Sequence, residues 1–212
     1  MIKNVKDLPD AGPAATAEVR LSQLRRQYRV LSACNRTLIH SSSEQELLTD
    51  ICRALVDIGG YRHAWVGYMS ARAGSAYEPS VSAAWSNGAL DPAQAAALHA
   101  LGNQTPALRA MHERAPQIVH EIEDERWSEP WRAQARHRGH TAAMAMPLLA
   151  DNRCIGVLEV YTDRKTGFEF SEVVLLNELA ADLAFGVATL RTRHEYERQQ
   201  NDLALLTRVL KT

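Results

Sequence analysis

Apolar residues follow a strand-like pattern in two consecutive stretches of the chain, from Thr141 to Leu149 and from Cys154 to Tyr161. The second stretch is rich in β-branched residues, which favour strands. Residues 150–153 lie between the two and include an Asp-Asn pair that is typical of a turn. The pattern therefore predicts a β-hairpin. Because Pro147 has no amide hydrogen, we expect the first strand to be bulged or unpaired at that position.

A short helix is expected just before this hairpin. The residues from Trp131 to His137 favour helix, and Gly139 is placed to end it. An apolar hairpin needs a cover on at least one face. This helix, with Trp127 and Trp131 near its start, is the natural candidate for that cover.

Helical spacing dominates the beginning of the chain. A first helix is expected from Ala17, because apolar residues then recur at steps typical of a helix. Ser43 and Glu46 form a capping-box pattern, which predicts the start of a second helix that ends at Gly59-Gly60. The apolar positions of the first helix include Leu21, Leu24, Tyr28, Leu31 and Leu38.

Two strands and several short elements should follow. Residues 61–70 alternate as a strand does, and residues 79–86 do so more weakly. Asp91-Pro92 and Thr105-Pro106 each combine an N-cap residue with a first-turn proline, which predicts helices to about Ala100 and to Arg114. Gln117 to Val119 is a short strand candidate.

The last predicted helix is long. It begins near Ser171, and its apolar stripe passes through a polar stretch from Arg191 to Asp202 before it resumes at Leu203, Leu206 and Leu210. Apolar stripes at both ends of the chain thus continue past the expected core. Such stripes need a partner helix or remain exposed, so we expect a parallel homodimer formed through the terminal helices.

The order of these motifs resembles the GAF domain family over roughly residues 25 to 190. The resemblance is carried by Trp131-x(7)-Gly139, by A-M-P-L at 145–148, and by I-G-V-L-E-V-Y at 155–161. It continues upstream at Glu46-Leu47-Leu48 and 63–68, and downstream in Phe168-x(3)-Glu172-x(2)-Leu175-Leu176.

The resemblance implies an α+β fold. A central antiparallel sheet of five or six strands should carry the terminal helices packed together on one face. Short helices and loops should cover a ligand cavity on the other. The corresponding division of the chain is an N-terminal tail over 1–19, a GAF-like domain over 20–190, and an exposed linker or signalling helix over 191–212.

Composition limits the partners and the cellular location that we expect. A formal net charge of −1 argues against a polyanion partner, so no nucleic acid is expected. No apolar run approaches the roughly 18 residues of a membrane-spanning helix, and MIKNVKDLPD lacks the core of a signal peptide. The widely spaced Cys34, Cys52 and Cys154 suit a reducing compartment. These features predict a cytoplasmic protein.

The candidate ligand-binding residues are mainly aromatic. In a GAF fold, the positions of Trp85, Trp127 and Trp131 surround the cavity between the sheet and its covering helices. Aromatic walls with a few polar groups are typical of small-molecule sites, but large aromatics are also buried in ordinary cores. Arg132 could fix an anionic or carbonyl group, or it could face solvent. Met144 and Met146 on the following strand complete the candidate set.

Other ligand classes have weaker support. His120, His137 and His140 could help to bind haem or a metal, but their spacing is not that of a ligand set, and solvated or locally bonded histidines are the favoured interpretation. We therefore assign no metal ligand and name no cofactor. Cyclic-nucleotide GAF domains carry an Asn-Lys pair, and bilin-binding relatives a Cys next to a His. Neither dipeptide occurs in the chain.

The sequence contains no nucleophile elbow or phosphate loop, so no catalytic residue is assigned. The GAF resemblance implies a sensory or regulatory module and not an enzyme. By resemblance, the domain binds a small ligand or partner and signals to an output domain absent from this chain. That domain would be a diguanylate cyclase, a phosphodiesterase or a histidine kinase, in cyclic-di-GMP or two-component signalling. The alternatives are a haem or metal sensor and an enzyme of the free methionine sulfoxide reductase type. The latter needs an accessible thiolate and a resolving thiol, and the three cysteines are not expected to converge.

Overall fold

The computed structural model describes residues 17–70, 78–86 and 104–209. Residues 1–16 of the expected tail over 1–19, the expected helix from Asp91 to Ala100, and Leu210 lie outside these ranges, whereas residues 17–19 of that tail belong to the first helix. In chain order the elements are α1 (Ala17–His40), α2 (Glu44–Asp57), β1 (His63–Ser70), β2 (Glu78–Ser86), α4 (Pro106–Glu113), β3 (Gln117–Val119), α5 (Glu129–His137), β4 (Ala142–Ala150), β5 (Arg153–Thr162) and α6 (Phe170–Val209).

The described strands form one five-stranded antiparallel sheet in the order β2-β1-β5-β4-β3, which confirms the predicted α+β class. The predicted hairpin is β4–β5. The position of its irregularity was predicted wrongly, because Pro147 pairs in register with Val157 and the register shifts between Leu148 and Leu149. The missing amide of a proline removes one donor, but a strand can keep its register through the neighbouring hydrogen bonds.

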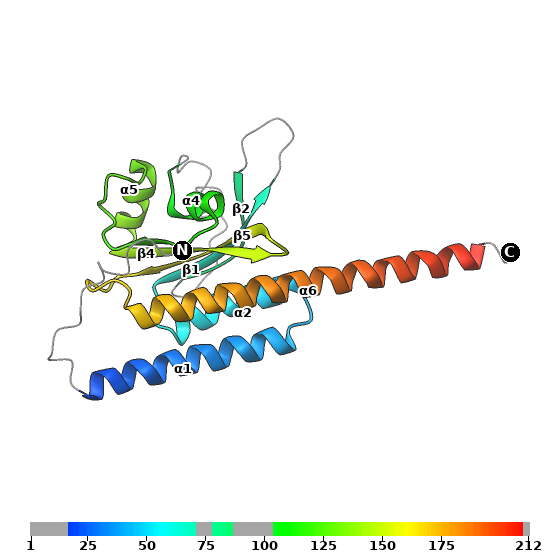
Figure 1. The fold of residues 1–212 in the computed structure, drawn as a ribbon, viewed down its shortest axis with the longest axis horizontal. Coiled ribbons are helices and arrows are strands. Elements are labelled where there is room, and N and C mark those ends of the chain that lie inside the picture. The colour runs from blue at the N-terminus through cyan, green and yellow to red at the C-terminus, as the bar shows by residue number, and fades with distance from the viewer. Residues whose placement is uncertain (1–16, 71–77, 87–103, 210–212) are drawn as a thin grey trace.

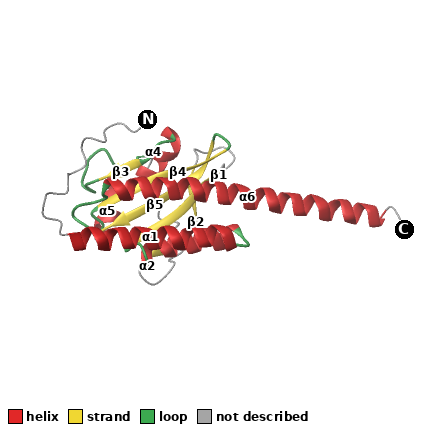
Figure 2. Cartoon of the chain, turned by 60° about the horizontal axis from the view of Figure 1, so that its bottom comes forward, coloured by secondary structure: helices red, strands yellow, loops and turns green. Residues whose placement is uncertain are grey.

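Three helices cover one face of the sheet (Figure 1). Helices α2 and α6 lie next to the strands, and α1 packs on both of them, as the turned view in Figure 2 also shows. The apolar stripes of α2 and α6 pack against the sheet and form a core. This core includes Leu47, Ile51 and Cys52 of α2 and Leu176, Leu179, Leu183 and Val187 of α6. The predicted packing of the terminal helices together on one face is confirmed.

Helices α4 and α5 lie over the opposite face (Figure 1). Helix α4 begins where the sequence indicates a start, and α5 begins at Glu129, two residues before the expected Trp131. The Thr105 side chain caps α4 by accepting a hydrogen bond from the Leu108 amide, and Pro106 occupies the first turn. Gly139 follows α5 with a φ of 70°, a conformation that glycine adopts without strain. The sheet is therefore a middle layer between two sets of helices.

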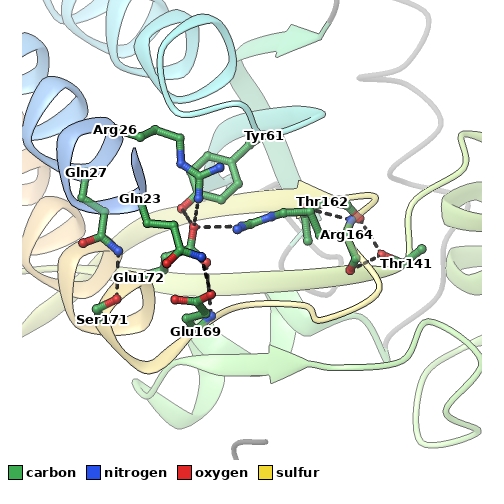
Figure 3. Close-up of polar contacts among 10 residues, drawn as sticks. All are labelled: Gln23, Arg26, Gln27, Tyr61, Thr141, Thr162, Arg164, Glu169, Ser171 and Glu172. Carbon is green, nitrogen blue, oxygen red and sulfur yellow. Dashed lines mark hydrogen bonds and ion pairs between the residues drawn. The ribbon is translucent and has the colours of Figure 1, made fainter. Parts of the chain in front are cut away.

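Polar contacts hold α1 against the start of α6 (Figure 3). Glu172, which is almost fully buried, accepts hydrogen bonds at Oε1 from Arg26 of α1 at 2.8 Å and from Arg164 at 2.9 Å. The Tyr61 hydroxyl donates to the same oxygen at 3.3 Å. The other oxygen, Oε2, accepts from the Glu169 amide just before the helix. One carboxylate thus caps α6 and joins it to α1.

Helix α6 is longer than the body of the domain and projects beyond it (Figure 1). By length and composition alone, its Phe170–Leu203 segment could cross a membrane. The core helix of a globular domain meets the same criterion, and the N-terminal half of α6 packs in such a core. From residue 191 to 203 every side chain is exposed.

Candidate ligand-binding site

Alternation along β1, β4 and β5 sends two different sets of side chains to the two faces of the sheet. Trp65, Ala143, Ala145, Val157 and Tyr161 point to the face under α4 and α5. Small alanines on β4 leave room there for the tryptophans of the cover. This face, which we call the α4/α5 face, is the candidate site.

A carboxyl group lies buried on this face. Glu159 is 0% exposed, and its Oε2 accepts a hydrogen bond from Trp65 Nε1 at 2.9 Å. Its Oε1 accepts none from any described residue. Burial raises the pKa of Glu159 to about 7, against the smaller opposite effect of the Tyr161 and Trp65 hydrogen-bonding groups. Near neutral pH this carboxyl group can therefore hold or release a proton.

Aromatic side chains on the same face form a wall that includes Tyr161, Trp131 and Trp127. Trp131 of α5 donates from Nε1 to the Tyr161 hydroxyl oxygen at 3.0 Å, and the two rings lie 6.3 Å apart. Trp127 packs on Trp131 at 6.0 Å. The indole Nε1 of Trp127 is buried and has no acceptor among the described residues. Rings of this kind bury a large area while leaving polar atoms available for a ligand.

Two histidines border the same wall. His140 lies 4.6 Å from the Tyr161 ring and stacks on His63 at 6.1 Å. Burial lowers the pKa of His63 to about 4 and that of His140 to about 3. Both rings are therefore neutral near pH 7. They extend the aromatic surface without adding charge.

Arg132 lies at the edge of the site and already has partners. Its Nη2 is 2.8 Å from a Glu129 carboxylate oxygen, and its Nη1 donates to the Glu123 carbonyl oxygen at 3.3 Å. Only its Nε lacks a partner within the described ranges. The positive charge expected to fix a ligand is thus largely neutralised by Glu129.

The proposed tryptophan set does not share one cavity. Trp127 and Trp131 lie together on the α4/α5 face, whereas Trp85 packs against the core on the helix α2/α6 side. Trp85 donates from Nε1 to Asp57 at the end of α2 at 3.2 Å, and the Arg53 guanidinium lies 5.8 Å from its ring centroid. The expectation that it would face Trp127 was wrong, because its cross-strand partner Ala64 points to the helix face.

Met144 and Met146 are also on the helix side of the sheet. Both are fully buried in the core with α6, and their neighbours Ala143 and Ala145 occupy the α4/α5 face. A strand sends adjacent residues to opposite faces, so choosing the methionines rather than the alanines selected the wrong side. Of the six candidate residues, Trp127, Trp131 and Arg132 remain at the site.

The histidines considered as metal ligands are dispersed. His120 and His137 are exposed, and His140 is buried beside Tyr161. Within the described ranges, no group of three His, Cys, Asp or Glu side chains is placed to hold a metal ion.

The cysteines are divided between the two faces of the sheet. Cys34 and Cys52 are buried in the helix core, where burial raises the pKa of both thiols, that of Cys34 to about 12. Cys154 packs at the far end of β5 against the α4/α5 cluster, and burial also raises its pKa. All three thiols are free.

Trp65, Glu159 and Tyr161 are site residues that we did not predict. A sequence signal for them exists. Glu159 is a charged residue inside the apolar run of β5, and Tyr161 follows two positions later on the same face. A buried charge in an otherwise apolar strand needs a partner or a function.

The chain matches the family model for the GAF domain over residues 41–188. Among solved structures, it resembles the GAF domain of a phosphoenolpyruvate-protein phosphotransferase from Coxiella burnetii, with a TM-score of 0.66 at 13% identity over 81% of this chain and 98% of that one. A free methionine-R-sulfoxide reductase from Neisseria meningitidis, solved with its substrate, gives a TM-score of 0.63 at 16% identity, over 79% of this chain and 91% of that one.

A third resemblance is to a domain of a putative two-component sensor histidine kinase from Sinorhizobium meliloti 1021. Its TM-score is 0.54 at 21% identity, over 70% of this chain and 92% of that one. Among curated proteins, none matches the chain significantly. These neighbours share the fold, and the family match spans most of the sequence. The chain belongs to the GAF domain family.

Proposed function

We propose that this GAF domain is a sensory module that binds a small ligand on its α4/α5 face and passes the signal through α6. The output domain lies outside this chain. GAF-fold neighbours within sensor proteins, such as the histidine kinase domain, support a signalling role. Diguanylate cyclases, phosphodiesterases and histidine kinases are the candidate output domains, in cyclic-di-GMP or two-component signalling.

One observation carries the proposal: the same two strands, β4 and β5, contribute side chains both to the site and to the core in which α6 packs. On β5, Glu159 and Tyr161 face the site while Leu158 and Val160 face the helices. On β4, alanines face the site and Met144 and Met146 face α6. A ligand that displaces β4 or β5 must therefore displace the packing surface of α6.

We expect signal transmission to involve a homodimer. Large apolar side chains are exposed on α1 and along α6, including Leu24, Tyr28 and Phe185. A parallel pairing of the terminal helices would cover them and align the projecting ends of α6. We place the domain in the cytoplasm, where its free thiols would remain reduced.

The test is native mass spectrometry of the purified chain, together with an absorption spectrum. A co-purifying small molecule, lost on substitution of Trp131 by Ala but retained with Trp85→Phe, supports binding on the α4/α5 face. Retention of the ligand by Trp131→Ala would place binding elsewhere. Haem or flavin absorption would redirect the proposal to a cofactor sensor.

The enzymatic alternative is a reductase of the free methionine sulfoxide type, which one structural neighbour represents. Such chemistry needs a thiolate at the site and a second thiol to resolve the disulfide. Here two cysteines are in the opposite core, and burial raises the pKa of every thiol. We therefore infer that the domain is not an enzyme. Thiol-dependent turnover of the free sulfoxide would contradict this inference.

A further inference from the structure

We propose that Glu159 is the anchor for an organic cation, a ligand that presents a protonated amine or amidine to the free oxygen of this carboxyl group. The inference rests on the proposed function, because it assigns a ligand class to the same α4/α5 face. It adds the residue that recognises the ligand and the charge that the ligand carries.

The first argument is the incomplete hydrogen bonding of the carboxyl group. Glu159 is fully buried, with Oε2 engaged by Trp65 and Oε1 without a partner among the described residues. An ionised carboxylate can accept at both oxygens. A buried acceptor without a hydrogen bond destabilises the folded state, and more so if it is charged. A ligand N–H directed at Oε1 would remove this destabilisation.

The second argument is the charge of the surroundings. Within the part of the chain that the structure describes, no lysine or arginine forms an ion pair with Glu159. Arg132, the cation proposed from the sequence to fix a ligand, is paired with Glu129. An anion brought to this face would meet the carboxylate without a compensating cation. A positively charged ligand would supply the missing partner.

The third argument is the aromatic wall. The Trp65 indole donates to the carboxyl group, and Tyr161, which Trp131 contacts, lies two residues along the same strand on the same face. The faces of tryptophan and tyrosine rings attract cations, most strongly where water is excluded. Trp127 adds a buried N–H with no acceptor among described residues. The ligand should therefore also carry an acceptor atom, such as a carbonyl or ring nitrogen.

A cationic ligand and a neutral ligand would bind different protonation states of Glu159. A cation selects the ionised carboxylate, whereas a neutral acceptor selects the protonated acid. The groups that influence the pKa of Glu159 are the Tyr161 hydroxyl on its own strand and the Trp65 indole on β1. His63 and His140, which contact Tyr161, stay neutral above pH 5 because burial lowers their pKa values to about 4 and about 3. Cation affinity should therefore rise with pH up to about 7.

The experiment is calorimetric titration of the full 212-residue chain with benzamidinium chloride as the probe. Benzamide is the neutral isostere of the probe, and benzoate is the anionic one. The variants are Glu159→Gln, which keeps the shape of the side chain, and Glu125→Gln, which removes an exposed carboxylate from the neighbouring acidic loop. Far-UV circular dichroism checks that each variant is folded.

We expect benzamidinium to bind the wild-type chain in preference to benzamide and benzoate. At pH 8, Glu159→Gln should weaken binding by about tenfold or more, the usual worth of a hydrogen bond to a charged group. Glu125→Gln should bind as the wild type does. In the wild type, the association constant should rise by up to about tenfold per pH unit between pH 5 and 7 and then level off.

Equal affinity in the wild type and Glu159→Gln, affinity that falls with pH, or no binding of benzamidinium would each overturn the inference. The wild-type pH profile decides even if Glu159→Gln does not fold. A neutral or anionic molecule that co-purifies on this face would overturn the cation assignment and leave the sensory proposal standing. If the wild-type chain shows neither a co-purified ligand nor binding of the probe, the result would count against both the cation assignment and the sensory proposal.

Discussion

Arg191 of α6 and Glu44 of α2 form a two-point ion pair, with Nε to Oε2 and Nη2 to Oε1 both at 2.8 Å. The same guanidinium lies 4.5 Å from the centroid of the Tyr68 ring on β1. Beyond this residue the side chains of α6 are exposed as far as Leu203. The pair therefore marks the point where α6 leaves the globular body, and it connects that point to both a helix and the sheet.

Arg191→Lys should loosen this connection. Lysine keeps the charge but loses the forked pairing and the flat contact with Tyr68. Because both partners are partly exposed, we expect a loss of only about 0.5–1 kcal/mol in the free energy of unfolding. Hydrogen exchange should nevertheless become faster in α6 around residue 191. Arg193→Lys, which alters a pair with Glu197 within α6 alone, is the control, and equal exchange in the two variants would contradict the prediction.

Glu172→Ala should destabilise the domain strongly. It leaves Arg26 and Arg164 without their shared carboxylate and removes the cap at the Glu169 amide. Loss of one partner from a buried ion pair costs about 3–5 kcal/mol, and the partial exposure of both arginines places the expected loss near about 3 kcal/mol. Urea denaturation measures it. Ser171→Ala, which removes an exposed contact with Gln27, should change stability by less than about 0.5 kcal/mol.

Glu159→Gln should change how stability depends on pH. Burial raises the pKa of this carboxyl group from the ordinary 4.5 to about 7, so the unfolded chain loses its proton at lower pH than the folded one. The wild type therefore loses stability from this group as pH rises from about 4.5 to about 7. The variant lacks that loss. Its stability relative to the wild type should increase across this window by a few kcal/mol and stay constant above it. Parallel pH curves for the two proteins would exclude a raised pKa.

His140→Gln should act in the opposite pH direction. Burial lowers the pKa of His140 from 6.5 to about 3, so below pH 6.5 the unfolded chain binds a proton that the folded chain does not. This group therefore removes stability as pH falls from 6.5 towards 3. Relative to the wild type, the variant should become progressively more stable in that range. Urea midpoints at pH 7, 5.5 and 4.5 measure the trend, and an unchanged difference would contradict it.

The proposed dimer can be tested by light scattering on this chain and on a version that ends at Leu190. We expect a dimer for the longer form and a monomer for the shorter one, because the projecting part of α6 is absent from it. Tyr28→Glu should also weaken association, since the Tyr28 side chain is 72% exposed on α1. A monomer at every concentration for the full chain would rule out self-association through these helices.

Much of the fold could be predicted because local signals agreed with the final packing. The Ser43 side chain accepts a hydrogen bond from the Glu46 amide at the start of α2, where the capping box indicated. Thr105 and Gly139 likewise mark helix ends in α4 and α5. These signals depend on neighbours in sequence, so they are readable without a structure.

The site was harder to predict because it depends on which face each strand residue occupies. Trp85 belongs to the helix side because β2 pairs it with Ala64, and this register is set by long-range contacts. Met144 and Ala143 are adjacent in sequence but lie on opposite sides of the sheet. A shift of one residue in an assumed strand exchanges the two sets. Glu159 interrupts the apolar run of β5 in the sequence, but its complete burial is seen only with the cover of α4 and α5 in place.

The uninterrupted course of α6 allows a small tilt inside the domain to be carried well outside it. From Arg191 to Val209 the helix rises by about 27 Å at about 1.5 Å per residue. A rotation of about 5° about the Arg191–Glu44 pair would therefore sweep the far end through about 2 Å. The packed segment from Phe170 to Arg191 is about as long, so the same tilt moves its first turn by a similar distance. A tilt of α6 within the core would therefore appear at the projecting end as a displacement of similar size, comparable to the shifts seen between helices in switching proteins.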